Sequence, residues 1–397
     1  MRGRIVLFLP ALGRFRAAPV AVAVLAALAL AACGSGSSGS PSTVTVASPS
    51  PAAGALDMAL LSHLDLATLA QAPAAGHEVE GTQVAALSAA GNWGYTTAGG
   101  RRFALTGLST GTSIVEVTDP ARPRNVALVT GPESQWREIR TYGEYVYTTT
   151  EAPWGLDIIS MKDPDHPRRI QTWNKTFRTA HSLWIDTDRG LLFVNGANGR
   201  AGGMRVLDIG SNPEDPSEVG AFTDFYIHDS YSRGNVLFAS AISDGVEVLL
   251  DVTDPRRIRE TTRFFTGGRF THNSWLTRDG RYLFTTDERS GMPVEGWDIT
   301  TPTAPRKVTQ FIANPAAIAH NVMIDGDRLL VSHYTEGVYL LDIRNPEQPR
   351  VIGSYDTFPG PSGGFNGAWG AYVFPASNLI VASDISGGLF VLAYTGP

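Results

Sequence analysis

A phrase that recurs six times is the feature of this sequence that most restricts its fold. Each copy has an alternating apolar run, then usually Asp or Asn beside a Pro, a few polar residues and a second short apolar run, and the copies return about every 42 to 49 residues. They read IVEVTDPARPRNV (114–126), LDIISMKDPDHPRRI (156–170), MRVLDIGSNPEDPSEV (204–219), VEVLLDVTDPRRI (246–258), VEGWDITTPTAPRKV (294–308) and VYLLDIRNPEQPRVIG (338–353). A repeat of this length indicates one supersecondary unit per copy, stacked on its neighbours.

The middle of the phrase has the chemistry of a tight turn. Asp or Asn at the first turn position caps the backbone with its side chain, and Pro fixes φ at the second. We therefore interpret Asp119, Asp163 and Asp254 as turn residues, since each has a Pro beside it and lacks the alternating acidic spacing of a calcium loop. The fourth copy, DPRRIRE, has no second Pro, so its turn is expected to be tighter.

Two more strand-like runs precede each phrase, for example 181–185 and 191–194 before Met204, so each unit holds four short strands. The seventh unit, from Trp369 to Leu392, supplies three strands only, and Leu60 to Asp65 resembles the outer strand of the sixth unit. Closing the ring in this way would remove a free sheet edge. We predict an all-β fold: a seven-bladed β-propeller in which an N-terminal strand completes the last blade.

The first 54 residues have the composition of a targeting segment followed by a linker. Four arginines precede an apolar run from Ala17 to Ala32, and Leu30-Ala31-Ala32-Cys33 is similar to the lipobox of bacterial lipoproteins, in which the cysteine takes a diacylglycerol. Gly, Ser, Pro, Thr and Ala follow up to about Gly54. We predict a signal peptide over 1–33 with the mature start at Cys33, a flexible tether over 34–54 and the propeller over 55–397.

This organisation predicts an extracytoplasmic lipoprotein that a lipid on Cys33 anchors to a membrane, at the cell surface or facing the periplasm. Cys33 is the only cysteine, so no disulfide within the chain contributes to stability. The net charge of −6 provides no basic surface for a nucleic-acid backbone, and nucleic acid is excluded as a partner. We expect a monomer.

Longer phrases carry a family resemblance. The pattern V-x-L-D-I-x-x-P-x-x-P resembles the LVIVD repeat, and the chain from about Leu60 to Leu392 is similar to the choice-of-anchor B family of bacterial surface proteins. The match rests on TGLSTGTSIVEVTDP (106–120), TAHSLWID (179–186) and FNGAWGAYVFPASNLIVASDISGGLFVL (365–392). The resemblance implies a β-propeller displayed outside the cytoplasm, with an anchor that varies between members, and it implies no particular reaction.

Four histidines occupy equivalent places at the start of the first strand in successive units: His181, His228, His272 and His320. The first strand of a blade is the innermost one, so we expect these imidazoles to ring the mouth of the central channel. The other residues expected at this face are Arg137, Glu138, Glu151, Asp287, Glu288 and Asp384, flanked by Trp93 and Trp369, with His333 as a further candidate. The remaining repeated tryptophans, Trp136, Trp184, Trp275 and Trp297, are interpreted as packing between sheets.

Imidazoles and carboxylates that converge on a channel could hold zinc, iron or copper, or recognise an anionic ligand when protonated. A repeated histidine could instead bond to the backbone of the neighbouring blade and hold the ring together, which is the interpretation we favour from sequence. Three functions stay open. We favour a non-enzymatic surface module that binds a protein, a glycan or a small molecule. The alternatives are a metal-dependent, lactonase-like hydrolase with the four histidines as ligands and Glu138 or Glu151 as base, and a structural envelope scaffold.

Overall fold

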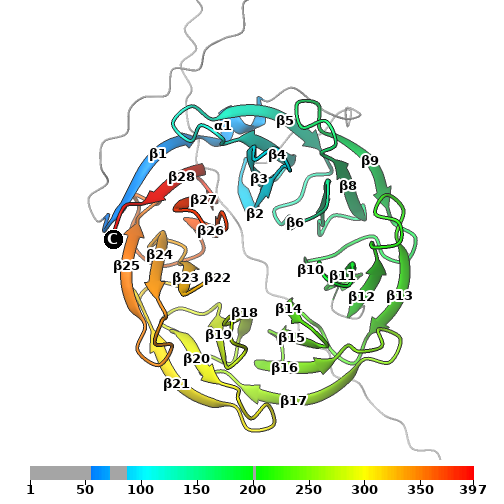
Figure 1. The fold of residues 1–397 in the computed structure, drawn as a ribbon, viewed down its shortest axis with the longest axis vertical. Helices are drawn as coiled ribbons and strands as arrows, with labels where there is room; N and C mark the ends of the chain where they lie inside the picture. The colour runs from blue at the N-terminus through cyan, green and yellow to red at the C-terminus, as the bar shows by residue number, and fades with distance from the viewer. Residues whose placement is uncertain (1–54, 72–86, 200–202) are drawn as a thin grey trace, which may run out of the picture. The chain divides into compact units, whose positions relative to one another are not determined.

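The structure, a computed structural model, describes residues 55–71, 87–199 and 203–397. Within these ranges, seven antiparallel sheets of four strands stand around a central axis as blades (Figure 1). The predicted all-β, seven-bladed propeller is confirmed. The signal segment, Cys33 and the predicted tether lie outside the described residues. No helix within the described ranges has the length and apolar character needed to cross a membrane.

In blades 1 to 6 the strands run from inner to outer in chain order, and the repeat phrase supplies the third and fourth strands. Blade 1 consists of β2 (Ala89–Thr96), β3 (Arg102–Leu108), β4 (Gly111–Glu116) and β5 (Arg124–Thr130). Blade 2 consists of β6 (Ile139–Tyr142), β7 (Tyr145–Thr148), β8 (Leu156–Ser160) and β9 (Arg168–Trp173). Blade 3 consists of β10 (Ser182–Asp186), β11 (Leu191–Asn195), β12 (Met204–Asp208) and β13 (Ser217–Phe222). Blade 4 consists of β14 (Asp229–Arg233), β15 (Val236–Ala241), β16 (Val246–Asp251) and β17 (Arg259–Phe265).

The remaining three blades complete the ring. Blade 5 consists of β18 (Thr271–Leu276), β19 (Tyr282–Asp287), β20 (Val294–Asp298) and β21 (Arg306–Phe311). Blade 6 consists of β22 (Asn321–Asp325), β23 (Arg328–Ser332), β24 (Val338–Asp342) and β25 (Arg350–Tyr355). Blade 7 consists of β26 (Ala368–Val373), β27 (Leu379–Asp384), β28 (Gly388–Tyr394) and β1 (Met58–Leu64), which the short helix α1 (Leu66–Ala70) follows.

The hydrophobic core lies between neighbouring blades. Second strands such as β11 and β27 are buried along their whole length, because a sheet packs on each of their faces, and both are nearly continuous apolar runs. One apolar cluster joins Leu105 of blade 1 to Ile139 and Val146 of blade 2. Outer strands such as β17 are mostly exposed and carry charged residues. A continuous apolar run therefore marks a buried second strand, and a strand with charged residues marks the exposed outer edge of the blade.

The turn of the repeat phrase has the predicted chemistry. The carboxylates of Asp119, Asp163 and Asp254 each accept a hydrogen bond from the backbone N–H two residues on, at 3.3, 3.1 and 3.1 Å. The expectation of a tighter fourth turn is wrong. Asp251 pairs with Arg259 across that turn just as Glu116 pairs with Arg124 across the first, so the two turns span the same number of residues. A proline fixes φ but does not set the length of a turn.

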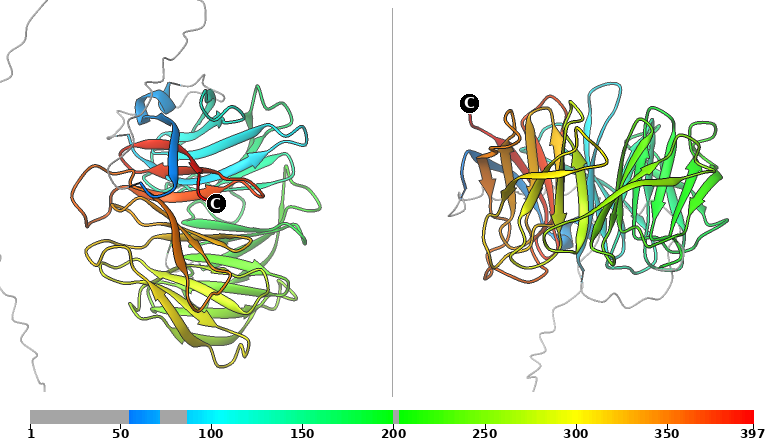
Figure 2. Two further views of the ribbon diagram at one scale, coloured as in Figure 1. Left: turned by 60° about the vertical axis from the view of Figure 1, so that its left-hand side comes forward. Right: turned by 90° about the horizontal axis from the view of Figure 1, so that it is seen from below.

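The N-terminal strand closes the ring as predicted. β1 pairs antiparallel with β28, and Figures 1 and 2 show it at the outer edge of blade 7. Every pairing of a third with an outer strand contains a register shift, and the β1 pairing has one too, between Leu60 and Ser62. The Ser62 hydroxyl donates to the Pro120 carbonyl of blade 1 at 2.6 Å, so β1 also fastens the seam between the last and first blades.

Candidate functional site

Four imidazoles from successive blades form a continuous arc at the start of the inner strands. His181, His228 and His320 directly precede β10, β14 and β22, and His272 lies in β18. Neighbouring ring centroids are 4.0 Å apart for His181 and His228, 4.3 Å for His228 and His272, and 4.3 Å for His272 and His320. We call these four residues the histidine arc. The four histidines come together because they occupy equivalent positions in four successive blades.

Aromatic rings extend the arc into blade 7. Trp369 of β26 lies 4.4 Å from His320, centroid to centroid, and stacks on Trp136 at 4.6 Å with an interplanar angle of 21°. Trp369 occupies the place in its blade that a histidine takes in blades 3 to 6. Trp136 precedes β6 and is thus part of this aromatic series, as well as packing between neighbouring blades.

Two of the four histidines bond to the backbone of the next blade. His228 Nδ1 donates to the His272 carbonyl at 3.2 Å, and His320 Nδ1 donates to the Trp369 carbonyl at 2.5 Å. These bonds are the ring-closing contacts that the structural interpretation requires. Burial, together with the charge of neighbouring imidazoles, holds the pKa of His228 and His272 well below the usual range, and burial lowers the pKa of His320 to about 3. These three imidazoles are therefore neutral near pH 7.

His181 differs from the other three because it has a carboxylate partner. Its Nδ1 lies 2.7 Å from Glu151 Oε1. Burial opposes the charge of this ring, but the hydrogen bond and charge of Glu151, with the charges of Glu138 and Asp229, outweigh burial and raise the pKa of His181. The histidine arc thus has one end that favours the cationic form and a neutral remainder.

Glu288 lies against the other end of the histidine arc. One of its oxygens, Oε2, is 3.9 Å from His272 Nε2, and the other, Oε1, is 3.7 Å from His320 Nε2. The Tyr334 hydroxyl donates to Oε1 at 2.6 Å and thereby fixes the orientation of the carboxylate. Burial raises the pKa of Glu288.

Two more carboxyl groups lie in the channel. Glu138 accepts a hydrogen bond from Trp369 Nε1 at 3.1 Å and lies 3.5 Å from Arg140 Nη1. Asp229, which sequence reasoning missed, accepts from Asn273 Nδ2 at 2.8 Å. Burial raises the pKa of both groups. Asp229 directly follows His228 in YIHDSY, and a polar residue after each arc histidine was the signal that could have revealed it.

Three of the predicted mouth residues have other partners. Arg137 donates to the carbonyls of Leu108 and Pro132 and is buried between blades 1 and 2. Asp287 accepts hydrogen bonds from Thr266 and from the backbone N–H groups of Gly268 and Phe270, so it caps the loop between blades 4 and 5. Asp384 caps a loop in the same way, through Thr357, Ser386 and Gly387. These three residues support the scaffold, and the structure does not direct them toward the imidazoles.

His333 is also separate from the histidine arc. It lies after β23, fully buried, with its ring 6.1 Å from that of Tyr339 in the same blade, and neither ring nitrogen has a hydrogen-bond partner among the described residues. Burial lowers its pKa. Its position after the second strand of the blade, rather than before the first, accounts for the separation.

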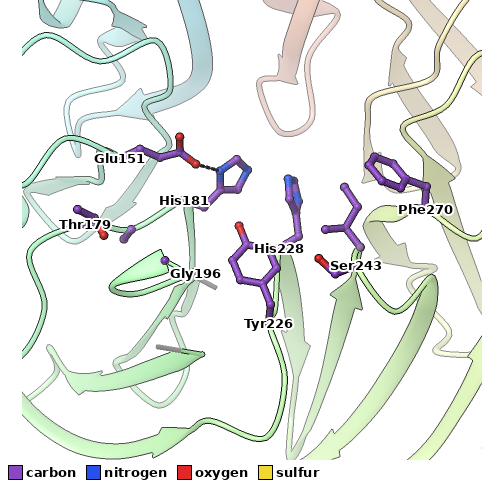
Figure 3. Close-up of a pocket in the computed structure, with 11 residues that line it drawn as sticks. Glu151, Thr179, His181, Gly196, Tyr226, His228, Ser243 and Phe270 are labelled. Carbon is purple, nitrogen blue, oxygen red and sulfur yellow. Dashed lines mark hydrogen bonds and ion pairs between the residues drawn. The ribbon is translucent and has the colours of Figure 1, made fainter. Parts of the chain in front are cut away.

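A pocket of about 420 Å³ opens beside the histidine arc. Figure 3 shows Glu151 and His181 on one side of it, Phe270 on the other, and Tyr226 and His228 between them. Its remaining lining includes Ser243, Ile242 and the backbone of the loops that hold Thr179 and Gly196. The pocket thus combines two aromatic side chains with a carboxylate–imidazole pair.

Aromatic side chains fill the channel further along the inner strands. Trp184 contacts Trp275 and Trp93 edge to face, with centroids 5.1 and 6.5 Å apart. The Arg140 guanidinium lies over Trp93 and Trp184, at 4.3 and 5.6 Å from the ring centroids. Trp93, Trp184 and Trp275 each follow the equivalent of the arc histidine by three residues. Trp184 and Trp275 also pack against the apolar clusters that join neighbouring blades, in agreement with the sequence interpretation.

Comparison with known proteins supports the repeat and the fold. The LVIVD repeat family matches residues 199–224 and 316–357. The chain carries LVIVD repeats. The second LVIVD segment spans all of blade 6, from the loop before His320 to the end of β25, whereas the first covers the third and outer strands of blade 3. The narrower resemblance to the choice-of-anchor B family stays a prediction, and a search of curated proteins found no match.

Two solved structures resemble this LVIVD-repeat propeller. One is a putative 6-phosphogluconolactonase from Bacteroides fragilis, with a TM-score of 0.55, 12% identity, and coverage of 77% of this chain and 89% of that chain. The other is a protein from Lactobacillus plantarum, with a TM-score of 0.56, 14% identity, and coverage of 75% and 88%. At these identities the similarity shows the fold alone.

Proposed function

We propose that this protein is an exported, lipid-anchored propeller that binds a small polyhydroxylated molecule, of the size and chemistry of a sugar, in the pocket beside the histidine arc. The observation that carries the proposal is the pocket itself. Its volume of about 420 Å³ lies in the range of small-molecule sites and suits a ligand of one or two sugar rings.

The lining favours a polar ring compound. Tyr226 and Phe270 supply aromatic faces, on which the C–H face of a sugar ring can pack. The Glu151 carboxylate accepts hydrogen bonds from hydroxyl groups, and the His181 imidazolium donates them. Because these two side chains pair with each other, the pocket is close to neutral overall, which suits an uncharged ligand better than an anion.

A panel of monosaccharides, disaccharides and sugar lactones, screened by thermal shift and then by calorimetry, tests this proposal. We expect at least one member to bind, and Glu151→Gln and Phe270→Ala each to weaken that binding at least tenfold, because each removes one face of the pocket. His166→Ala, at an exposed histidine of the blade 2 turn, is the control and should bind normally. The proposal fails if no member binds, or if both pocket variants bind as the unchanged protein does.

A second candidate is hydrolysis of a sugar lactone, and the Glu151–His181 pair favours it. A carboxylate that holds an imidazole by Nδ1 is the arrangement of a general acid–base pair. Because the pKa of His181 is raised, its neutral form, which can take a proton from water, is populated at higher pH, so turnover should increase as pH rises. The Bacteroides fragilis relative is named for a lactonase, which makes lactones the substrate class to try. Turnover that His181→Gln lowers about 100-fold would support hydrolysis. Lactone binding without turnover would leave the binding function alone.

A further inference from the structure

A second site lies at the opposite end of the histidine arc from the Glu151–His181 pair. One ligand atom each from His228, His272 and Glu288 lies within 4.8 Å of the other two. Metal bonds of about 2.0 to 2.2 Å place neighbouring ligand atoms roughly 3 to 4 Å apart, so a small inward rotation of the side chains brings all three into bonding range of one ion. Two imidazoles and one carboxylate are a common ligand set for zinc and for other divalent metals of the first transition row.

The backbone fixes the tautomers that a metal requires. A carbonyl oxygen can only accept a hydrogen bond, so His228 and His320 must carry their protons on Nδ1, where they donate to the carbonyls of His272 and Trp369. The lone pair of each ring is then on Nε2. This pairing of one ring nitrogen with a backbone carbonyl and the other with a metal is the usual arrangement of histidine ligands.

One of these lone pairs has no partner of its own. Among the described residues, His320 Nε2 has no hydrogen-bond partner, although its side chain is only 1% exposed. It faces Glu288 Oε1 at 3.7 Å, and His272 Nε2 faces the other oxygen of the same carboxylate at 3.9 Å. Buried polar atoms are normally satisfied, so an unpartnered imidazole nitrogen that faces a carboxylate without bonding to it points to a bound ion between them.

The charges around the site favour a cation. Glu138, Asp229 and Glu288 are three carboxyl groups with little contact with water, set against the Arg140 guanidinium and the His181 imidazole. A divalent ion would neutralise part of the negative charge of the carboxylates and would also bind the free imidazole lone pairs.

We propose that His228, His272 and Glu288 bind a zinc-class divalent metal ion, with His320 Nε2 as the fourth ligand. Tyr334 is a positioning residue, because it reaches the metal only through its hydrogen bond to Glu288 Oε1. The site shares His228 with the lining of the sugar pocket, but the other three proposed ligands do not line that pocket. Metal binding can therefore succeed where sugar binding fails, and the reverse.

Titration with Zn²⁺ and Co²⁺ alone tests the proposal, with the full chain carrying Cys33→Ser and no histidine tag, so that neither a thiol nor a tag competes for the ion. After chelator treatment and dialysis, we expect one Zn²⁺ per chain by calorimetry, a higher melting temperature with the metal, and Co²⁺ absorption bands typical of four nitrogen and oxygen ligands. Glu288→Gln should weaken Zn²⁺ binding by 10- to 100-fold, and His272→Ala should abolish the Co²⁺ bands.

Two further variants separate loss of a ligand from loss of the fold. Tyr334→Phe keeps all four ligands and removes only the hydroxyl that orients Glu288, so we expect Zn²⁺ binding several-fold weaker in a normally folded protein. His166→Ala, outside the site and 82% exposed, should bind Zn²⁺ as the unchanged protein does. Substoichiometric binding to the unchanged chain, or equal weakening in His166→Ala and Glu288→Gln, overturns the proposal.

Discussion

At the scale of single residues, the buried acid Glu247 shows how this fold responds to pH. Its carboxyl group accepts hydrogen bonds from Ser240 in its own blade at 2.9 Å and from Ser274 in the next blade at 2.7 Å. Burial raises the pKa of Glu247 to about 7, against the two serine hydrogen bonds, and the charges of Asp229 and Asp287 add to the increase. The folded protein therefore holds this proton at a pH where the unfolded chain has lost it.

The consequence is a loss of stability as pH rises. Below about pH 4.5 the carboxyl is protonated in both states, whereas between about pH 4.5 and pH 7 only the folded state keeps the proton, so the contribution of Glu247 to stability falls across this window. We expect Glu247→Gln to remove up to about 3 kcal/mol of this pH-dependent loss, because each pKa unit corresponds to about 1.4 kcal/mol. Urea unfolding of both proteins at pH 4.5, 6 and 8 measures the effect, and parallel curves for the two proteins would contradict it.

The candidate site was predictable where a residue's place in the repeat decides its location. The four arc histidines share one position in successive units, so the period alone brings them together. Side-chain direction is a different matter: Asp287 and Glu288 are neighbours in sequence, yet Asp287 caps a loop and Glu288 faces the imidazoles. Successive residues in an extended chain point to opposite sides, and the sequence does not show which of the two faces the channel at the end of a strand.

At the scale of elements, the predicted fold followed from turn chemistry and from counting strands. The proline-containing turns of the repeat phrase marked the third and outer strands of six blades, and the missing strand of the seventh identified β1 before any contact was known. What could not be predicted was how neighbouring blades touch. The Trp173 indole N–H donates to the Pro216 carbonyl, and a Cβ at Gly220 would overlap the Pro255 carbonyl, because each outer strand lies against the turn of the next blade. These contacts between blades depend on the distance between neighbouring sheets, and the sequence of one repeat does not reveal that distance.

Closure by β1 predicts that a covalent link across the seam stabilises the whole ring. Ala59 and Ala393 are direct partners in the β1–β28 pairing, and both are partly buried, so a cysteine pair there lies in reach of a disulfide. In a Cys33→Ser background, we expect oxidised Ala59→Cys/Ala393→Cys to be about 2 to 4 kcal/mol more stable than its reduced form, since the link joins the two ends of the propeller.

Urea unfolding of the oxidised and reduced forms of one variant makes the measurement. The matched control is Asp298→Cys/Arg306→Cys, which joins β20 to β21 across a single turn within one blade. Its shorter loop should give a smaller gain, because the entropy removed from the unfolded chain grows with loop length. If mass spectrometry shows that the seam disulfide has formed but the urea midpoint of unfolding is unchanged, separation of β1 from β28 does not limit the stability of the propeller.

At the scale of the whole molecule, the question is what would hold this protein at a membrane. Its net charge of −6 disfavours adsorption to an anionic lipid surface. We propose that the diacylglycerol on Cys33 provides the membrane attachment. One acyl chain binds a membrane only marginally and reversibly, whereas two chains give stable anchoring.

If the lipid is the anchor, the sulfur atom of Cys33 decides whether the protein stays with the membrane. In the native host, the unchanged protein should remain in the membrane fraction after a high-salt wash, and Cys33→Ser should move to the soluble fraction, because replacing the sulfur with oxygen removes the site of lipid attachment. Ser40→Ala, in the predicted tether, is the control and should stay with the membrane. At 1 M salt, ionic attractions over more than about 3 Å are largely screened, so retention of Cys33→Ser under that wash would mean that the propeller itself holds a membrane partner.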